Sequence, residues 1–145
     1  MDDAAHLLLE GFDAHAYLRA LIAIVKVAGV TDTERDYVES RARVLGVDSA
    51  PLWQETLTEL PVLPDSVTER TRRVVLRDCV FIACIDGDYA DKERAWVHRI
   101  RDWLGLAPEV SDLFEDWFRR YFDLMDEQEA LLLGFEPPVG RFLDR

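Results

Sequence analysis

The amino-acid sequence predicts an all-α fold, a single-domain bundle of about six to seven helices built from two pseudo-symmetric halves. Apolar residues recur at helical spacing along nearly the whole chain, and glycines and prolines fall between the periodic stretches. One segment of 13 residues occurs twice, which indicates a repeated structural unit. With 145 residues, 49% of them hydrophobic, the chain 1–145 is expected to form one domain that needs no disulfide or structural metal.

The first half, about residues 14–60, is predicted to contain three helices. A central helix over residues 14–28 ends at Gly29, and its wide apolar stripe is formed by Leu18, Leu21, Ile22, Ile24, Val25 and Val27. Thr31 and Glu34 form a capping box that opens the second helix, which stops at Gly46. The third helix begins near Pro51 and continues to about residue 60.

The second half, about residues 66–123, repeats this order after a proline-bounded connector at residues 61–64. A capping box of Ser66 and Glu69 is expected to open the fourth helix, which ends at Gly87. That helix starts with arginines between residues 70 and 77, for which a solvated face is favoured over a site for an acidic partner. The fifth helix is predicted over about residues 91–104.

The sixth helix starts at Pro108 and carries a dense aromatic stripe of Phe114, Trp117, Phe118, Tyr121 and Phe122. Such a stripe is typical of a buried core, and its density would also suit a subunit interface. The remaining tail, residues 124–145, is apolar but interrupted by glycine and proline. It is expected to pack back on the body of the domain.

The repeat is an ungapped alignment of residues 34–46 with residues 93–105. Identical residues occupy five aligned pairs: Glu34/Glu93, Arg35/Arg94, Val38/Val97, Leu45/Leu104 and Gly46/Gly105. A long apolar helix precedes each copy, and a proline-opened amphipathic helix follows it. One such unit exposes an apolar face that it cannot bury alone, so we expect the two units to stack against each other.

Residues 82–94 read Ile-Ala-Cys-Ile-Asp-Gly-Asp-Tyr-Ala-Asp-Lys-Glu-Arg, and Leu104 and Gly105 follow. This order resembles TerB-like domains, a family named for the tellurite-resistance protein TerB, with a related domain at the start of a membrane-anchored DnaJ-type co-chaperone. The resemblance covers roughly residues 18–122, although the first half lacks the aspartate before its glycine. It implies an adaptor in a stress-response or membrane-associated complex, and acidic patches of such domains have been suggested as metal sites.

Four carboxylates, Asp86, Asp88, Asp91 and Glu93, lie within eight residues around a glycine turn. Hard divalent cations such as calcium or magnesium require several such oxygens, so this loop is a candidate cation site. Its spacing differs from an EF-hand, because Val97 stands where the bidentate glutamate belongs. Ordinary helix capping by Asp91 and Glu93 is the simpler interpretation, and contact with a protein partner is a third.

The composition restricts the possible partners. Twenty-nine acidic residues against 17 basic ones give a net charge of −12, which disfavours nucleic acid and anionic membranes and favours a cation or a basic protein face. The N-terminus is acidic rather than basic, and the apolar runs are about half the ~20 residues that a membrane span needs. We therefore expect a cytoplasmic protein without direct membrane insertion.

No enzyme signature is found in the sequence. The histidines His6, His15 and His98 are scattered, without the spacing of a metal-binding pair, and no glycine-rich phosphate loop occurs. Cys79 and Cys84 point to different sides of one helix, and buried, inert thiols are the favoured interpretation.

The sequence therefore favours a non-enzymatic TerB-like adaptor domain that binds other proteins and one divalent cation. A first alternative is a structural homodimer formed through the aromatic helix. A second is a carboxylate-ligated metalloenzyme with Asp86, Asp88 and Glu93 as ligands. That enzyme would need further ligands from the first half, where the acidic residues on offer are Asp32, Glu34 and Asp36.

Overall fold

The structure, a computed structural model of the chain, describes residues 11–55, 63–85 and 89–135. Within these ranges it contains six helices and no strand, which confirms the all-α prediction. In chain order they are α2 (Ala14–Ala28), α3 (Asp32–Leu45), α4 (Ala50–Gln54), α5 (Glu69–Cys84), α6 (Asp91–Trp103) and α7 (Pro108–Leu133). In the described residues no helix combines the length and apolarity needed to cross a bilayer.

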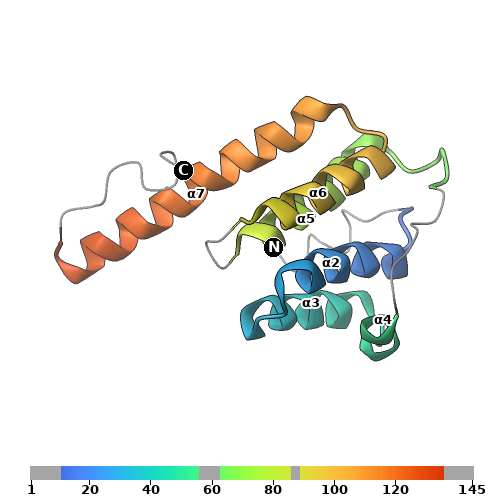
Figure 1. Cartoon of the computed structure of the whole chain (residues 1–145), viewed down its shortest axis with the longest axis horizontal. Helices are drawn as coiled ribbons and strands as arrows, with labels where there is room; N and C mark the ends of the chain where they lie inside the picture. The colour runs from blue at the N-terminus through green and yellow to red at the C-terminus, as the bar shows by residue number, and fades with distance from the viewer. Residues whose placement is uncertain (1–10, 56–62, 86–88, 136–145) are drawn as a thin grey trace.

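The two halves share one hydrophobic core. Helix α2 packs against α3 and α4, and α5 packs in the same way against α6 and α7. Helix α2 also packs against α5 and α6, so the first half closes on the second (Figure 1). The largest fully buried apolar side chains come from α2, α5 and α6 and from the residue that follows α6: Tyr17, Leu18, Leu21, Ile24, Leu76, Ile82, Ile100 and Leu104.

The repeated segment ends both α3 and α6 with the same glycine turn. Gly46 and Gly105 adopt left-handed φ angles of 69° and 71°. In each case the residue after the glycine donates its amide hydrogen to a carbonyl five residues earlier, Val47 to Ala42 and Leu106 to Arg101. This is the Schellman arrangement, in which glycine avoids the steric cost of a Cβ atom.

Replacing either glycine by alanine is expected to cost the same, about 1 kcal/mol of unfolding free energy. The added Cβ meets nothing within 4 Å at Gly46 and makes only an ordinary contact, 3.8 Å from Arg72, at Gly105, so only the left-handed backbone is penalised. Urea unfolding of Gly46→Ala and Gly105→Ala measures both values. A loss at only one position would contradict the structural equivalence of the two turns.

Two predicted boundaries in the middle of the chain differ from the structure. Helix α5 starts at Glu69 with Thr68 as its N-cap, whose side chain accepts a hydrogen bond from the amide of Thr71 at 3.2 Å. Ser66 is not the cap, because Val67 is buried and its amide bonds to Pro64, which keeps this segment in a turn. Helix α4 spans Ala50–Gln54 and ends where Glu55 adopts an extended backbone conformation, earlier than the predicted end near residue 60. Residues 56–60 lie outside the described residues.

The predicted tail also differs. Helix α7 continues to Leu133, and Gly134 ends it with a φ of 81°. No helix breaker lies between Pro108 and Gly134, so the helix extends beyond the body instead of folding back (Figure 1). We call residues 123–135 the overhang. Its large apolar side chains are exposed rather than packed on the body: Leu124, Met125, Leu131, Leu132, Leu133 and Phe135. Residues 136–145 lie outside the described residues.

Candidate functional site

A groove of about 640 Å³ lies between α5 and the first half of α7. Three arginines line it, Arg73 and Arg77 from α5 and Arg120 from α7. The other lining residues, Asp78 apart, are apolar or aromatic: Phe81, Val110, Leu113, Phe114, Trp117, Phe118 and Tyr121. We call this surface the α5–α7 groove. An apolar groove with cationic groups is suited to an apolar ligand that carries negative charge.

The aromatic stripe predicted on α7 is divided between core and surface. Phe118 is buried, and its ring centroid lies 5.5 Å from that of Phe81 on α5. Trp117 and Tyr121 stack on each other at 5.6 Å, but they remain 49% and 36% exposed. Leu113, one turn before Trp117, is 65% exposed. The stripe therefore anchors α7 to α5 and also presents an exposed apolar face, a feature that is typical of interaction surfaces.

A buried polar network lies beneath the groove and joins three helices. Asp78 of α5 is only 2% exposed. Its Oδ2 accepts a hydrogen bond from the Tyr17 hydroxyl at 2.8 Å, and its Oδ1 accepts one from Arg77 Nε at 3.0 Å. The guanidinium of Arg41, from α3, lies 4.0 Å from Oδ2. These neighbours satisfy the carboxylate, so Asp78 has a positioning role between the halves rather than that of a free catalytic base.

Two tyrosines of this network hold their protons strongly. Burial, and then the charge of Asp78, raises the pKa of Tyr17 well above 10.0. Burial, followed by Asp78, raises the pKa of Tyr37 to about 12. Arg41 donates to the Tyr37 hydroxyl from Nε at 3.2 Å and from its terminal nitrogen at 3.1 Å, which opposes this shift only in part. Neither phenol supplies a base near neutral pH.

Replacing Tyr37 by phenylalanine is expected to reduce the sensitivity of the fold to alkali. Because the folded-state pKa is raised to about 12 from 10.0, the neutral phenol stabilises the fold fully below about pH 10. That contribution is lost as the pH rises towards 12, so the wild type should lose about 2 kcal/mol more than Tyr37→Phe between about pH 9 and pH 12. Urea unfolding of both proteins at the two pH values measures this difference, and a constant difference would contradict the assignment.

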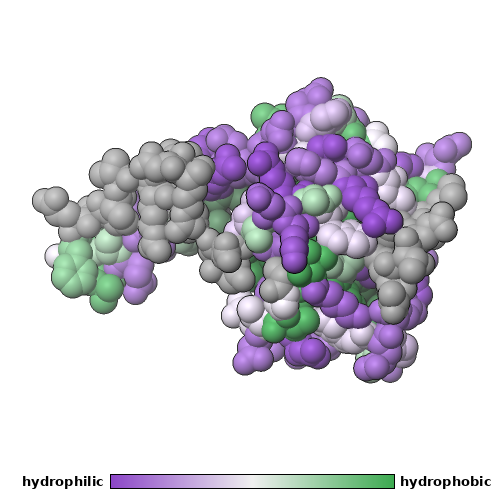
Figure 2. Space-filling model, viewed as in Figure 1, coloured by the Kyte–Doolittle hydropathy of each residue, from purple (hydrophilic) through white to green (hydrophobic). Residues whose placement is uncertain are grey.

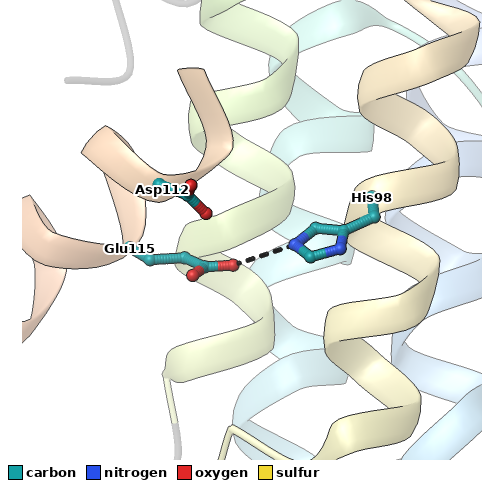
Figure 3. Close-up of side chains that lie close together, drawn as sticks. All are labelled: His98, Asp112 and Glu115. Atoms are coloured by element: carbon teal, nitrogen blue, oxygen red, sulfur yellow. Dashed lines mark ion pairs between the residues drawn. The ribbon is translucent and has the colours of Figure 1, made fainter. Parts of the chain in front are cut away.

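A second cluster lies between α6 and α7, where His98, Asp112 and Glu115 each place a ligand atom within 4.8 Å of the others (Figure 3). Glu115 is buried at 2% exposure. Its Oε1 accepts from the Tyr89 hydroxyl at 2.8 Å and lies 3.5 Å from His98 Nε2, while Arg94 lies 3.1 Å from its Oε2. A divalent cation could bind here, although Arg94 opposes it on the same carboxylate.

The repeat gives this second cluster a structural role as well. His98 aligns with Glu39, which accepts hydrogen bonds from Trp53 Nε1 at 2.9 Å and from Ser49. Arg94 aligns with Arg35, whose guanidinium lies 4.6 Å from the ring centre of Trp53. In both halves these two positions therefore hold the second helix of the unit against the third.

The predicted acidic loop is only partly described. Asp86 and Asp88 lie outside the described residues. Asp91 is exposed in the first turn of α6. Glu93 is buried, and its Oε1 accepts the amide hydrogen of Ala90 at 3.2 Å, which is the capping role. Within the described ranges, His98, Asp112 and Glu115 form the one group of three side chains with metal-ligand spacing, and neither Asp91 nor Glu93 belongs to it.

Of the residues proposed for a metalloenzyme, Asp86 and Asp88 lie outside the described residues, and the described ones form no group with metal-ligand spacing. Asp32 and Asp36 are exposed on α3, and Glu34 is buried at its N-terminus, where its Oε1 accepts from the Thr31 hydroxyl at 2.7 Å. Cys79 is fully buried, and burial raises the pKa of its thiol well above 9.0. This agrees with the predicted inert thiol.

The sequence did not predict the α6–α7 cluster or the network around Asp78, because each is assembled from side chains of different helices. Asp112 and Glu115 are one turn apart on α7, which was a usable signal, but His98 joins them only because α6 packs on α7. Likewise, Asp78 interrupts an apolar run, and such an aspartate in a helix that is otherwise buried signals a polar partner from another helix.

The chain was compared with family models, with curated proteins and with solved structures, and no match was found in any of the three.

Proposed function

We propose that this chain is a non-enzymatic adaptor domain that binds an amphipathic helix of another protein in the α5–α7 groove. The observation that supports this function is the combination of an uncovered apolar face on α7 with three arginines around it. Leu113 and Trp117, which are 65% and 49% exposed, are suited to anchor a partner helix, because aromatic and aliphatic anchors supply most of the binding energy at such interfaces.

The charge of the groove defines the partner. The whole chain carries a net charge of −12, yet Arg73, Arg77 and Arg120 meet at this surface. Asp78 neutralises part of this charge through Arg77. Arg73 and Arg120 lie 3.5 Å from Glu69 and 3.3 Å from Asp116 on their own helices, but they remain 44% and 59% exposed and can still meet a partner. A helix with acidic residues beside its apolar stripe is therefore the complementary occupant.

The resemblance of residues 82–94 to TerB-like domains agrees with an interaction role over a catalytic one. By that resemblance, the adaptor would act in the cytoplasm as part of a stress-response or membrane-associated complex. The carboxylate of Asp78 accepts a hydrogen bond from Tyr17, and the pKa values of Tyr17 and Tyr37 are raised. These features support an interaction role, since none of the three groups is arranged for acid–base catalysis near neutral pH.

Binding of designed helical peptides tests the proposal. Two fluorescent, covalently stapled peptides would share one leucine stripe, one flanked by glutamates and the other by lysines. We expect the acidic peptide to bind at least tenfold more tightly, because each close charge contact with the exposed arginines contributes about 0.2–1 kcal/mol. Fluorescence anisotropy measures both affinities, and equal affinities or no binding would contradict the proposal.

Matched variants locate the binding surface. Leu113→Glu places a charge in the groove and should weaken binding of the acidic peptide at least tenfold, because it also removes an anchor worth about 1.5–3 kcal/mol when buried. Val30→Glu makes the same charge change at another exposed apolar residue, 40% exposed and remote in sequence, and should leave binding unchanged. An equal loss in both variants would indicate a general charge effect rather than a groove.

A second candidate function is binding of a divalent cation, favoured by the approach of His98, Asp112 and Glu115 within 4.8 Å. A histidine and two carboxylates are suited to zinc, whereas the predicted Asp86 and Asp88 loop is suited to calcium or magnesium. Calorimetric titration of metal-stripped protein with each ion distinguishes the two. Zinc binding should weaken at least tenfold in His98→Gln and persist in Asp86→Asn/Asp88→Asn. If the heat of zinc binding is identical in His98→Gln and in the wild type, the α6–α7 cluster is excluded as the zinc site.

A further inference from the structure

The exposed apolar stripe of α7 does not end with the body of the domain. Trp117, Tyr121, Leu124, Gln128 and Leu131 follow one another at spacings of four, three, four and three residues. This is the alternation of a heptad seam, which packs against a second helix. Trp117 and Tyr121 belong to the α5–α7 groove, and Leu124 and Leu131 belong to the overhang. One continuous seam therefore joins the groove to the overhang.

Three leucines of the overhang are largely exposed. Leu124, Leu131 and Leu132 are 57%, 63% and 76% exposed, and Figure 2 shows apolar side chains gathered at this end of the molecule. An isolated helical segment of this length is marginal in water. A helix that carries three leucines into solvent therefore gains stability when another helix covers them.

The overhang has the chemistry that the groove requires. Between residues 121 and 135 there is no lysine or arginine, and the acidic residues are Asp123, Asp126, Glu127 and Glu129. The groove, by contrast, is lined by Arg73, Arg77 and Arg120. A second copy of the chain therefore supplies an acidic apolar helix to a basic apolar groove.

The lengths also match. The helical part of the overhang, residues 123–133, is about 16 Å long. The stretch of α7 that lines the groove, from Val110 to Tyr121, is about 18 Å long. If two α7 helices lie antiparallel about a two-fold axis near residue 122, each overhang covers the groove of the other chain. Such an isologous arrangement closes on itself and leaves neither seam exposed.

We propose that two copies of this chain pair through antiparallel α7 helices, each overhang lying in the other chain's α5–α7 groove. This inference rests on the proposed function, since it names the chain itself as an occupant of the docking groove. The dimer is then a self-occluded state, and a partner helix has to compete with the overhang. Access to the groove falls as the concentration of the chain rises.

Sedimentation equilibrium of the full chain tests the pairing. We expect a concentration-dependent dimer, and we expect Leu124→Glu/Leu131→Glu to raise its dissociation constant at least a hundredfold. The double variant changes two residues that are exposed in the monomer, so its fold should survive, and circular dichroism checks this. Val30→Glu is the control and should dimerise as the wild type does. A wild-type chain that stays monomeric, or a dimer that both overhang substitutions leave unchanged, overturns the proposal.

Charge exchange tests the reciprocal contact. Glu127→Arg/Glu129→Arg and Arg73→Glu/Arg120→Glu should each weaken the dimer at least tenfold, because each places like charges together. All four changes in one chain should restore it within about threefold, since the opposite charges meet again. Failure of the combined variant to recover any affinity contradicts docking of the overhang at these arginines.

The monomeric Leu124→Glu/Leu131→Glu variant separates this inference from the proposed function. If it binds the acidic stapled peptide while the wild type never dimerises, the groove stands and the self-pairing is wrong. If it does not bind the peptide, the groove itself is wrong, and the self-pairing falls with it. If peptide binding or dimerisation is detected only after residues 136–145 are deleted, that segment occupies the groove in the full chain. The self-pairing is again overturned in that case.

Discussion

Replacing Asp78 by alanine is expected to lower the free energy of unfolding by about 3–5 kcal/mol. The change removes the buried acceptor of the Tyr17 hydroxyl and of Arg77 Nε, and it removes the carboxylate that lies 4.0 Å from the Arg41 guanidinium. Breaking a buried network of hydrogen bonds and ion pairs on one side is costly, because water does not replace the lost carboxylate. Urea unfolding at neutral pH measures the loss.

The double variant Arg41→Met/Asp78→Leu is the control for this interpretation. It removes both charges and fills the space with apolar atoms, so it should recover a large part of the stability lost in Asp78→Ala. A loss below about 1 kcal/mol in Asp78→Ala, or no recovery in the double variant, would show that the network does not hold the two halves together as described.

Replacing Phe118 by alanine is expected to cost about 3–5 kcal/mol, because the ring is buried and fills the contact between α5 and α7. Its centroid lies 5.5 Å from Phe81 and 6.4 Å from Phe122, so its loss opens a cavity that these rings cannot close. The expected result is a protein that unfolds at markedly lower urea concentration, with the first half of α7 loosened from the body.

Leu132→Ala is the matched control on the same helix. Leu132 is 76% exposed, so in the monomer its truncation should change the unfolding free energy by no more than about 0.5 kcal/mol. Both variants are to be compared at a protein concentration at which the chain is monomeric. Equal losses at Phe118 and Leu132 would contradict the division of α7 into an anchored half and an overhang.

Local signals predicted much of the first half. Thr31 caps α3 through its hydroxyl, as the capping box indicated, and Gly29 and Gly46 end α2 and α3 where the sequence placed these ends. The apolar stripe of α2 predicted a central helix, and Leu18, Leu21 and Ile24 are fully buried. These features could be predicted because each depends on residues that lie within about one helical turn of one another.

The features that the sequence could not provide depend on contacts between helices. Whether Trp117 or Phe118 faces α5 depends on how α7 is rotated against the body, which periodicity alone does not set. The arginines of α5 were interpreted as a solvated face, yet Arg72 donates hydrogen bonds to the carbonyls of Val67 and Leu104 and Arg77 pairs with Asp78. The expectation for the tail followed its glycine and prolines, although the first of them, Gly134, comes only after the last helical residue, Leu133.

The central claim is that the α5–α7 groove docks an acidic amphipathic helix. Its most direct test is a titration of isotope-labelled Leu124→Glu/Leu131→Glu protein with the acidic stapled peptide, followed by two-dimensional NMR. The account predicts chemical-shift changes concentrated at Arg73, Arg77, Leu113, Trp117 and Tyr121, with α3 and α4 unchanged. Changes centred on α3 and α4, or no changes at millimolar peptide, would contradict it.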